Sequence, residues 1–272
     1  MTHVFRRFAI WLVCAALLCA AGLQSNFAQN NNAKPAETAA PKHRLGLVNE
    51  YTIRPGLMNE YLEWAKNEAR PLYVKAGIKE AYFFTQVYGD RAITTFTEVH
   101  DSFAALKARN EAFNKNNSPE ALAALSAGAN RYIEHTRTFI VETLPELSWR
   151  NPKLSSPPPY YLVTTRFVAP QRGRDYEAYL KNDWLPLVKK ADANGLLASR
   201  NRFGGEGQYT IFTPVNDLAD LDQPNPVTRM LGAEAVAKVQ QKLVGIVQRT
   251  ETRVLRLRPE ISIIPAPATA TK

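Results

Sequence analysis

Hydrophobic and polar positions along residues 43–149 change their period from one segment to the next. From Arg44 to Ile53, apolar and β-branched residues dominate, and the run stops at Arg54-Pro-Gly, which predicts a strand. From Leu57 to Ala76, apolar residues recur at helical spacing, and Gly77 follows as a natural stop. The segment therefore begins with a strand followed by a helix.

The rest of this segment predicts a hairpin, a second helical region and a last strand. Tyr82–Tyr88 and Arg91–Thr97 are strand-like runs joined by a Gly-Asp turn signal. Asp101 and Ser118 are residues that favour helix N-caps, so we expect the second helical region in two pieces. Thr136–Leu144 then predicts the final strand, which gives the order β-α-β-β-α-β.

Residues 160–264 repeat this pattern. Ala92–Asp101 and Gln208–Asp217 agree at five of ten positions, and this alignment pairs Phe96 with Phe212. The repeat is long, so it indicates paired domains and not a solenoid.

The ends of the two segments match as well. Residues 144–148 read Leu-Pro-Glu-Leu-Ser and residues 258–262 read Arg-Pro-Glu-Ile-Ser, so Pro145 aligns with Pro259. The order of matching residues is the same throughout, which indicates an internal duplication.

The order β-α-β-β-α-β is that of a ferredoxin-like unit, in which four antiparallel strands carry both helices on one face. The other face of such a sheet must be covered. Two copies in one chain provide the cover if their sheets pack on each other. We therefore predict an α+β fold, with two tandem ferredoxin-like units packed as an intramolecular dimeric α/β barrel, and we expect a monomeric pseudo-dimer.

The first 28 residues have the order of a signal peptide. Arg6 and Arg7 precede an apolar run from Phe8 to Leu23, and polar and small residues follow. The alternative is an uncleaved membrane anchor, although the run is short for a span. Cleavage predicts a secreted or periplasmic protein with no integral membrane segment.

The remaining boundaries follow composition. Residues 29–42 are polar and Ala/Pro-rich and predict a flexible leader, and residues 265–272 predict a disordered tail. Residues 150–159 contain three successive prolines and predict a linker. The two barrel units are then 43–149 and 160–264.

Charge and cysteine content limit the chemistry. The net charge is +9, and removal of the signal peptide takes two arginines and no acid, leaving +7. No dense run of Lys or Arg occurs, so we expect no nucleic-acid partner. Both cysteines, Cys14 and Cys19, lie in the signal segment, so the mature chain has no disulfide, thiolate nucleophile or Cys-bound metal.

The residues Tyr51–Tyr61 (YTIRPGLMNEY) resemble the strand-turn-helix opening of NIPSNAP-like proteins. These belong to the dimeric α/β-barrel superfamily, which also contains small antibiotic-biosynthesis monooxygenases, EthD-like proteins and haem-binding chlorite-dismutase relatives. The second segment departs from the motif at Arg166–Gly173, where the turn is longer. The resemblance implies the fold, whereas the chemistry of the superfamily is diverse.

The candidate catalytic residues are His135, His100 and Glu50. A histidine can act as a base near neutral pH or ligate haem iron, for which His135 is the candidate; otherwise we expect no cofactor. Neither histidine is duplicated; one working half would look like this, but so would surface variation, which is the interpretation we favour. Strand alternation places Glu50 in the space between the two sheets, as an acid or base or as the partner of an arginine.

The candidate ligand-binding residues are Tyr82, Trp184, Arg200 and Arg202. Aromatic residues usually fill a core, but on a free sheet face they can line a cavity. Arg200 and Arg202 share one strand face and can hold a carboxylate or phosphate, or pair with acids. We therefore expect a small apolar or anionic ligand.

Three classes of function remain open. The first is a non-catalytic or small-ligand-binding exported protein. The second is a small barrel-type enzyme, either a cofactor-free monooxygenase or isomerase, or a haem protein. The third is a module that binds an envelope polymer or partner through its basic surface. The sequence does not decide whether the protein is an enzyme.

Overall fold

The computed structural model describes residues 42–88, 92–154 and 157–265. The expected signal peptide at 1–28 and the Gly89-Asp90 turn lie outside these residues. The expected leader and tail also lie outside them, except for one residue of each. Within the described ranges, no helix is long and apolar enough to cross a membrane.

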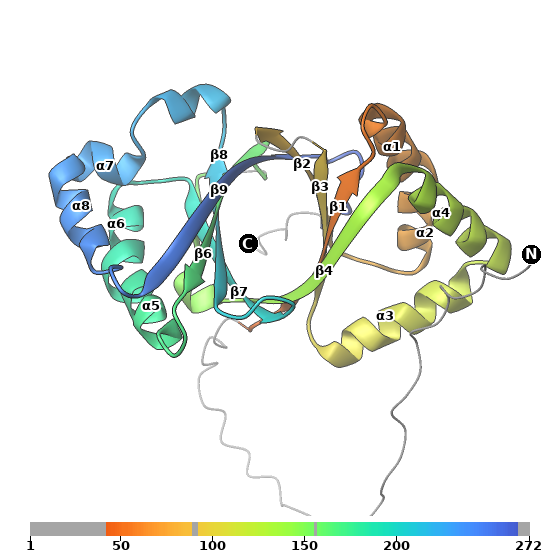
Figure 1. Cartoon of the computed structure of the whole chain (residues 1–272), viewed down its shortest axis with the longest axis horizontal. Coiled ribbons are helices and arrows are strands. Elements are labelled where there is room, and N and C mark those ends of the chain that lie inside the picture. The colour runs from red at the N-terminus through yellow and green to blue at the C-terminus, as the bar shows by residue number, and fades with distance from the viewer. Residues whose placement is uncertain (1–41, 89–91, 155–156, 266–272) are drawn as a thin grey trace, which may run out of the picture. The chain divides into compact units, whose positions relative to one another are not determined.

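Strands from both halves of the chain form one closed antiparallel barrel (Figure 1). The first half, residues 43–149, contributes β1 (Leu45–Ile53), β2 (Ala81–Tyr88), β3 (Ile93–His100) and β4 (Ile133–Thr143). The second half, residues 160–264, contributes β6 (Tyr160–Val168), β7 (Gly195–Phe203), β8 (Gln208–Val215) and β9 (Val247–Leu257). A short β5 (Trp149–Arg150) pairs with β7.

The two halves meet along two seams. The strand order is β4-β1-β3-β2-β9-β6-β8-β7, and β4 pairs back onto β7, which closes the barrel. The seams are therefore β2–β9 and β4–β7. Within each half the strands follow the same order, so the expected α+β barrel is confirmed.

The first helical region of each half is a single continuous helix with a π-helical turn in its middle. In the first half it comprises α1 (Met58–Trp64), the π turn Ala65–Ala69 and α2 (Arg70–Lys75). In the second half it comprises α5 (Gly173–Tyr179), the π turn Leu180–Trp184 and α6 (Leu185–Lys190).

The sequence predicts the extent of this helix but not its π turns. Pro71 and Pro186 are each the second residue after a π turn. A proline has no N–H to donate to the preceding turn, which favours the wider winding there.

The second helical region differs between the halves. The first half has two long helices, α3 (Phe103–Asn116) and α4 (Pro119–Tyr132). The second half has a 3₁₀ turn at Leu218–Asp222 and the shorter α7 (Pro226–Leu231) and α8 (Ala233–Gln241).

The two pieces of the first half begin at serine caps. Ser118 caps α4 as predicted, accepting a hydrogen bond from the amide of Ala121 at 3.2 Å. The cap of α3 is Ser102, which accepts from Ala105 at 3.1 Å, and not the expected Asp101. Asp101 instead pairs with Arg44.

The matching ends of the two halves are exchanged across the seams. The Ser148 hydroxyl accepts from the amide of Ala198 on β7 at 2.9 Å. In the same way, the Ser262 hydroxyl accepts from the amide of Phe83 on β2 at 2.9 Å. Pro145 and Pro259 therefore occupy matching places, and each half supplies a segment that completes the core of the other.

The alignment of Phe96 with Phe212 is wrong by one residue. Ile53 and Val168 occupy matching positions, each immediately after a bulge. Counting back from them through the strand partners matches Phe96 with Ile211. Phe96 packs beneath the helices, whereas Phe212 faces the barrel lumen. A one-residue shift in a strand reverses the face of a side chain, and the repeated threonines do not reveal it.

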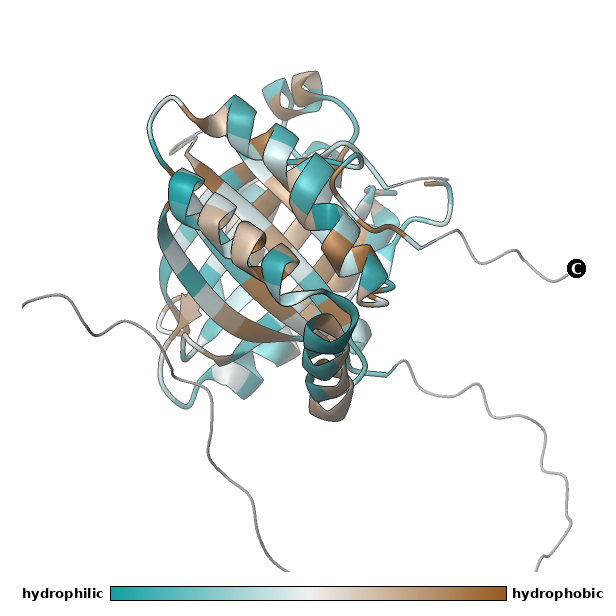
Figure 2. Cartoon of the chain, turned by 90° about the vertical axis from the view of Figure 1, so that its right-hand side faces the viewer, coloured by the Kyte–Doolittle hydropathy of each residue, from teal (hydrophilic) through white to brown (hydrophobic). Residues whose placement is uncertain are grey.

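The barrel has a helix-covered outer face and an inner lumen. Helices α1–α4 cover the sheet of the first half, and α5–α8 cover that of the second (Figure 1). Figure 2 faces the helices of the first half, along which hydrophilic and hydrophobic residues are interspersed. Each half thus has its own core between sheet and helices.

Candidate functional site

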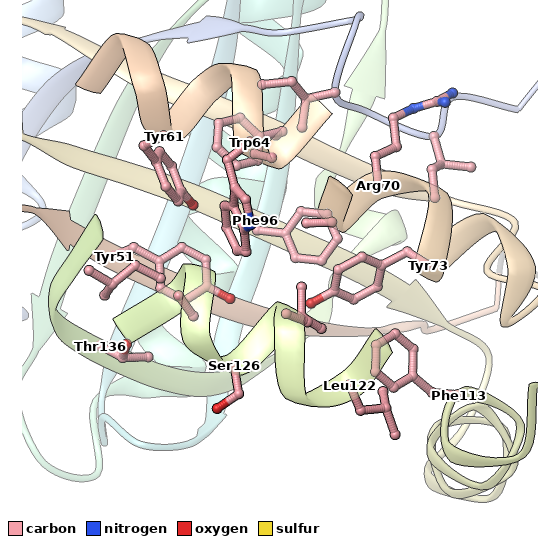
Figure 3. A pocket seen from close by; sticks show the side chains of 18 of the residues that line it. Tyr51, Tyr61, Trp64, Arg70, Tyr73, Phe96, Phe113, Leu122, Ser126 and Thr136 are labelled. Atoms are coloured by element: carbon pink, nitrogen blue, oxygen red, sulfur yellow. The ribbon is translucent and has the colours of Figure 1, made fainter. Parts of the chain in front are cut away.

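A cavity of about 390 Å³ lies between the sheet and the helices of the first half. We call it the aromatic cavity because seven aromatic side chains line it (Figure 3). The rings come from the outer face of the sheet and from α1, α2 and α3. They belong to Tyr51, Tyr61, Trp64, Tyr73, Phe83, Phe96 and Phe113.

Three tyrosine hydroxyls lie in this wall (Figure 3), together with the polar side chains of Arg70, Asn114, Ser126 and Thr136. Burial raises the pKa of Tyr73 to about 12, with Glu98 adding to the rise and Arg109 opposing it. Burial also raises the pKa of Tyr51 and of Tyr61 well above the usual value of a phenol. The three phenols are therefore neutral near pH 7 and can donate hydrogen bonds to an oxygen atom in the cavity.

A buried ion pair lies next to Tyr73. Glu98 on β3 is 1% exposed, and Arg109 on α3 donates hydrogen bonds to both of its carboxylate oxygens, with Nε 2.6 Å from Oε2. The Arg109 guanidinium also lies 5.4 Å from the centre of the Tyr73 ring and 5.0 Å from that of Phe113. This arrangement fixes two walls of the cavity and places a positive charge beside them.

Other elements close the cavity. Gly128 on α4 leaves room for the Trp64 indole, since a Cβ there would lie 2.2 Å from Trp64 Nε1. Ile261 and Ile263, which belong to the exchanged end of the second half, also line the wall. The cavity of the first half is thus completed by the second half.

The matching space in the second half is smaller, at about 180 Å³. Two substitutions in the π turn fill this space. Ala65 is replaced by Leu180 at the first position of the turn and Ala69 by Trp184 at the last, whereas the replacement of Tyr73 by the smaller Val188 acts in the opposite direction. At the position that matches Tyr51 the strand carries Arg166, whose guanidinium lies 5.7 Å from the centre of the Tyr176 ring.

The candidate catalytic residues lie outside the aromatic cavity and apart from one another. His135 is exposed on β4, and its neighbour Thr136 is the one that points into the cavity. Glu50 faces the lumen as predicted, and Arg253 Nη2 lies 2.6 Å from its Oε1, an ion pair without hydrogen-bond geometry. His100 is buried, and its Nε2 lies 3.4 Å from Oε2 of Glu98; it does not line the cavity.

The candidate ligand-binding residues are similarly dispersed. Arg200 and Arg202 share a face as predicted, but both contact Glu142, at 2.9 and 3.2 Å. Trp184 lines the smaller space of the second half. Tyr82 faces the lumen and donates to Glu80 at 3.1 Å.

The tyrosines of the cavity were not among the candidate residues. A signal was present, since Tyr61, Trp64 and Tyr73 lie on one face of the first helix. Strand alternation also places Tyr51 on the helix side. An aromatic stripe of this kind usually fills a core, and the cavity arises because small residues such as Ala65 and Ala69 stand between the rings.

The histidine expected as a haem ligand does not lie at the aromatic cavity. His135, the candidate ligand, points away from the cavity, and no histidine or cysteine lines the cavity within the described part of the chain. In the same part, no group of three or more His, Cys, Asp or Glu residues could hold a metal ion. The cavity is therefore suited to an organic ligand bound by the side chains themselves.

No protein-family model and no curated protein matches the sequence. Solved structures do match the fold. A protein provisionally described as a monooxygenase, from Lactobacillus acidophilus NCFM, is 9% identical; the match covers 83% of this chain and all of that one, with a TM-score of 0.55. Chlorite dismutase from Candidatus Nitrospira defluvii is 12% identical over 80% of this chain and 92% of that one, with a TM-score of 0.50.

A partial match of the same kind is a NIPSNAP family protein from Agrobacterium tumefaciens. It is 19% identical and covers 37% of this chain and 86% of that one, with a TM-score of 0.32. At such identities a likeness concerns the fold and not the chemistry. The protein thus has the fold of the dimeric α/β-barrel superfamily, as its sequence resemblance implied.

Proposed function

We propose that the protein binds a small, flat and mainly apolar molecule that carries an oxygen acceptor, in the aromatic cavity of the first half. The observation that carries this proposal is a ring-lined space of about 390 Å³ into which neutral tyrosine hydroxyls project. Rings favour a flat apolar body, and phenolic donors favour a carbonyl or phenolic oxygen.

A binding role is preferred to general acid–base catalysis. Within the described residues, neither a carboxylate nor an imidazole lines the aromatic cavity, and its tyrosines remain protonated at neutral pH. A proton acceptor would have to come with the substrate.

A cofactor-free enzyme is the second candidate, and the position of Arg70 favours it. Arg70 lines the aromatic cavity and its Nε donates to the carbonyl of Ser262 at 3.2 Å, so this side of the cavity can stabilise a negatively charged oxygen such as a phenolate. A bound 2-naphthol whose pKa, followed by its absorption spectrum, falls well below its value in water would support this candidate. An unchanged or raised pKa would leave the protein a binder.

The test of binding uses 2-naphthol, with naphthalene as its counterpart without oxygen, in calorimetric titrations. We expect the protein to bind 2-naphthol more tightly, and Tyr51→Phe to reduce this preference by about three- to tenfold, the value of one neutral hydrogen bond. Ala69→Trp, which copies the second half, should abolish binding. If both variants bind 2-naphthol as the wild type does, the ligand does not occupy this cavity.

We also propose that the two halves are duplicated ferredoxin-like units and that the chain is an exported monomer. The repeated strand order and the exchanged ends support the duplication. The basic and apolar order of residues 1–28 supports export. Terminal sequencing of secreted material should begin after residue 28, and an intact Met1 would contradict cleavage. Light scattering should give one chain per particle.

A further inference from the structure

The barrel lumen contains a second, partly open pocket, separate from the aromatic cavity. It has a volume of about 290 Å³ and lies at the end of the lumen where the chain crosses from the first half to the second. We call it the lumen chamber. Its walls are lumen-facing side chains of both halves, among them Tyr82, Phe84, Tyr161, Leu197 and Phe212.

The ring geometry shows that neither half makes this chamber alone. Phe84 of the first half lies edge-on to Tyr161 of the second, with ring centres 5.6 Å apart, and 6.2 Å from Phe212. Pro157 and Pro158, which belong to the linker, lie against the same space. The chamber therefore exists because the two sheets close into one barrel.

The polar groups around the chamber differ in whether they already have partners. Tyr82 donates to Glu80, which pairs with Arg44 at 2.6 Å, and Arg44 also pairs with Asp101 at 3.0 Å. Arg150 is different, because no carboxylate pairs with it among the described residues. Its guanidinium makes only a long contact of 3.5 Å to the carbonyl of Leu154.

Arg150 is close enough to Tyr161 to act on its phenol. Burial raises the pKa of Tyr161 to about 12, and the positive charge of Arg150 opposes this rise. The chamber thus combines apolar walls with the linked groups Arg44, Glu80 and Tyr82, with the phenol of Tyr161, and with one cation, Arg150, that has no carboxylate partner among the described residues. Arg150 is exposed and solvated, and a carboxylate bound here can accept charge-assisted hydrogen bonds from it as well as a hydrogen bond from Tyr161, which an uncharged ligand cannot match.

We propose that the lumen chamber binds one small aliphatic carboxylic acid, with its hydrocarbon chain against Phe84 and Phe212 and its carboxylate at Arg150. The volume is about twice that of an engineered cavity of ~150 Å³ that holds benzene, which suits an acid of medium chain length. This site is independent of the aromatic cavity, which takes a flat molecule on the outer side of the sheet.

The experiment titrates sodium octanoate, with octanol as the uncharged counterpart, into the full mature chain by calorimetry. The wild type should bind one octanoate and prefer it to octanol. Arg150→Gln should reduce the affinity for octanoate by about tenfold or more, the value of a charge-assisted hydrogen bond, and leave the affinity for octanol unchanged. An unchanged preference in Arg150→Gln would overturn the proposal.

Leu197→Trp provides the steric test, because Leu197 lines the chamber and is already 38% exposed, so a larger side chain has room to relax. It should abolish octanoate binding and leave 2-naphthol binding intact. Ala69→Trp is the matched control and should have the opposite pattern. Octanoate binding that survives Leu197→Trp but is lost in Ala69→Trp would place the acid in the aromatic cavity and overturn the proposal.

A labelling measurement covers the case in which Leu197→Trp does not fold. An octanoic acid that carries a diazirine at the end of its chain is irradiated with the wild-type protein, and the labelled peptides are sequenced. The proposal expects labels on the peptides of Phe84, Tyr161 or Phe212. Labels confined to the peptides of Tyr51 and Tyr73 would contradict it.

Discussion

The two halves of the barrel share their strand order, their π turns and their exchanged ends, yet only the first encloses a large cavity. The spaces between sheet and helices measure about 390 and 180 Å³. The largest single change is Ala69 in place of Trp184 at one matching position. The comparison teaches that the fold provides a place for a ligand in each half, and that a few side chains decide whether it is open.

The halves also differ in what supports these walls. The first half has the buried pair of Glu98 and Arg109 beneath its cavity. The strand position that matches Glu98 holds Thr213 in the second half. A charged support therefore accompanies the open cavity, and an uncharged strand accompanies the filled one.

Arg109→Ala should cause the largest loss of stability. It leaves the Glu98 carboxylate buried without its partner, which costs about 3–5 kcal/mol in the free energy of unfolding. Urea denaturation measures the loss. Thr213→Val, at the matching place of the second half, should change stability by less than about 1 kcal/mol. Equal losses in the two variants would contradict the asymmetry between the halves.

Trp184→Ala should enlarge the space of the second half toward that of the first. We expect a loss of about 2–4 kcal/mol in the free energy of unfolding, because a large side chain is removed from a packed wall. Thermal denaturation checks this. A loss below about 0.5 kcal/mol would show that Trp184 does not fill the second half.

Ser148→Ala and Ser262→Ala test what the halves have in common. Each removes the hydroxyl that accepts from a backbone amide of the opposite half. A buried amide that loses its partner costs about 1–3 kcal/mol, and the two variants should agree within about 0.5 kcal/mol. Chemical denaturation of both variants side by side measures this. A marked difference would mean that the two exchanged ends are not equivalent.

The smallest expected effect concerns the β4–β7 seam, where Glu142 forms an ion pair with Arg200. The matching residues of the β2–β9 seam are Arg256 and Thr85, which cannot form such a pair. Burial of Glu142 raises its pKa, but hydrogen bonds from Arg200 and Arg202 outweigh this and hold it below the usual value. A carboxylate whose pKa is lower in the folded state than in the unfolded state stabilises the folded protein at pH values above the unfolded-state pKa, near 4.3. This contribution is lost as the pH falls through the folded-state pKa.

The wild type should therefore lose stability between about pH 5 and pH 3, and Glu142→Gln should lose less over the same range. The difference in the free energy of unfolding should be below about 1 kcal/mol because the pair is partly exposed. Thermal denaturation across this pH range provides the measurement. The same dependence on pH in the wild type and the variant would show that Glu142 does not contribute to it.

Hydrophobic period and turn signals were sufficient to predict most of the fold. The alternation along β1 correctly placed Tyr51 under the helices and Glu50 in the lumen. Register was harder, because repeated threonines aligned Phe96 with Phe212 although the bulges set the strands one residue apart.

The candidate site could not be found in the same way. A residue's type shows whether it suits a core, but a cavity depends on how neighbouring volumes add up in space. Ala69 and Gly128 determine the space around Trp64 and Tyr73, and neither carries a chemical signal in the sequence. Histidine is a common catalytic residue type, yet His135 is exposed on the side of its strand that faces away from the aromatic cavity.

The most direct test of the central claim locates 2-naphthol by isotope-edited nuclear Overhauser measurements on the ¹³C-labelled protein. Binding in the aromatic cavity predicts contacts from the naphthol protons to the rings of Tyr51, Tyr73 and Phe113 in the first half. It predicts none to Trp184 in the second half or to Phe212 in the lumen. Contacts to Trp184 or Phe212 in the absence of contacts to Tyr51 and Tyr73 would contradict it.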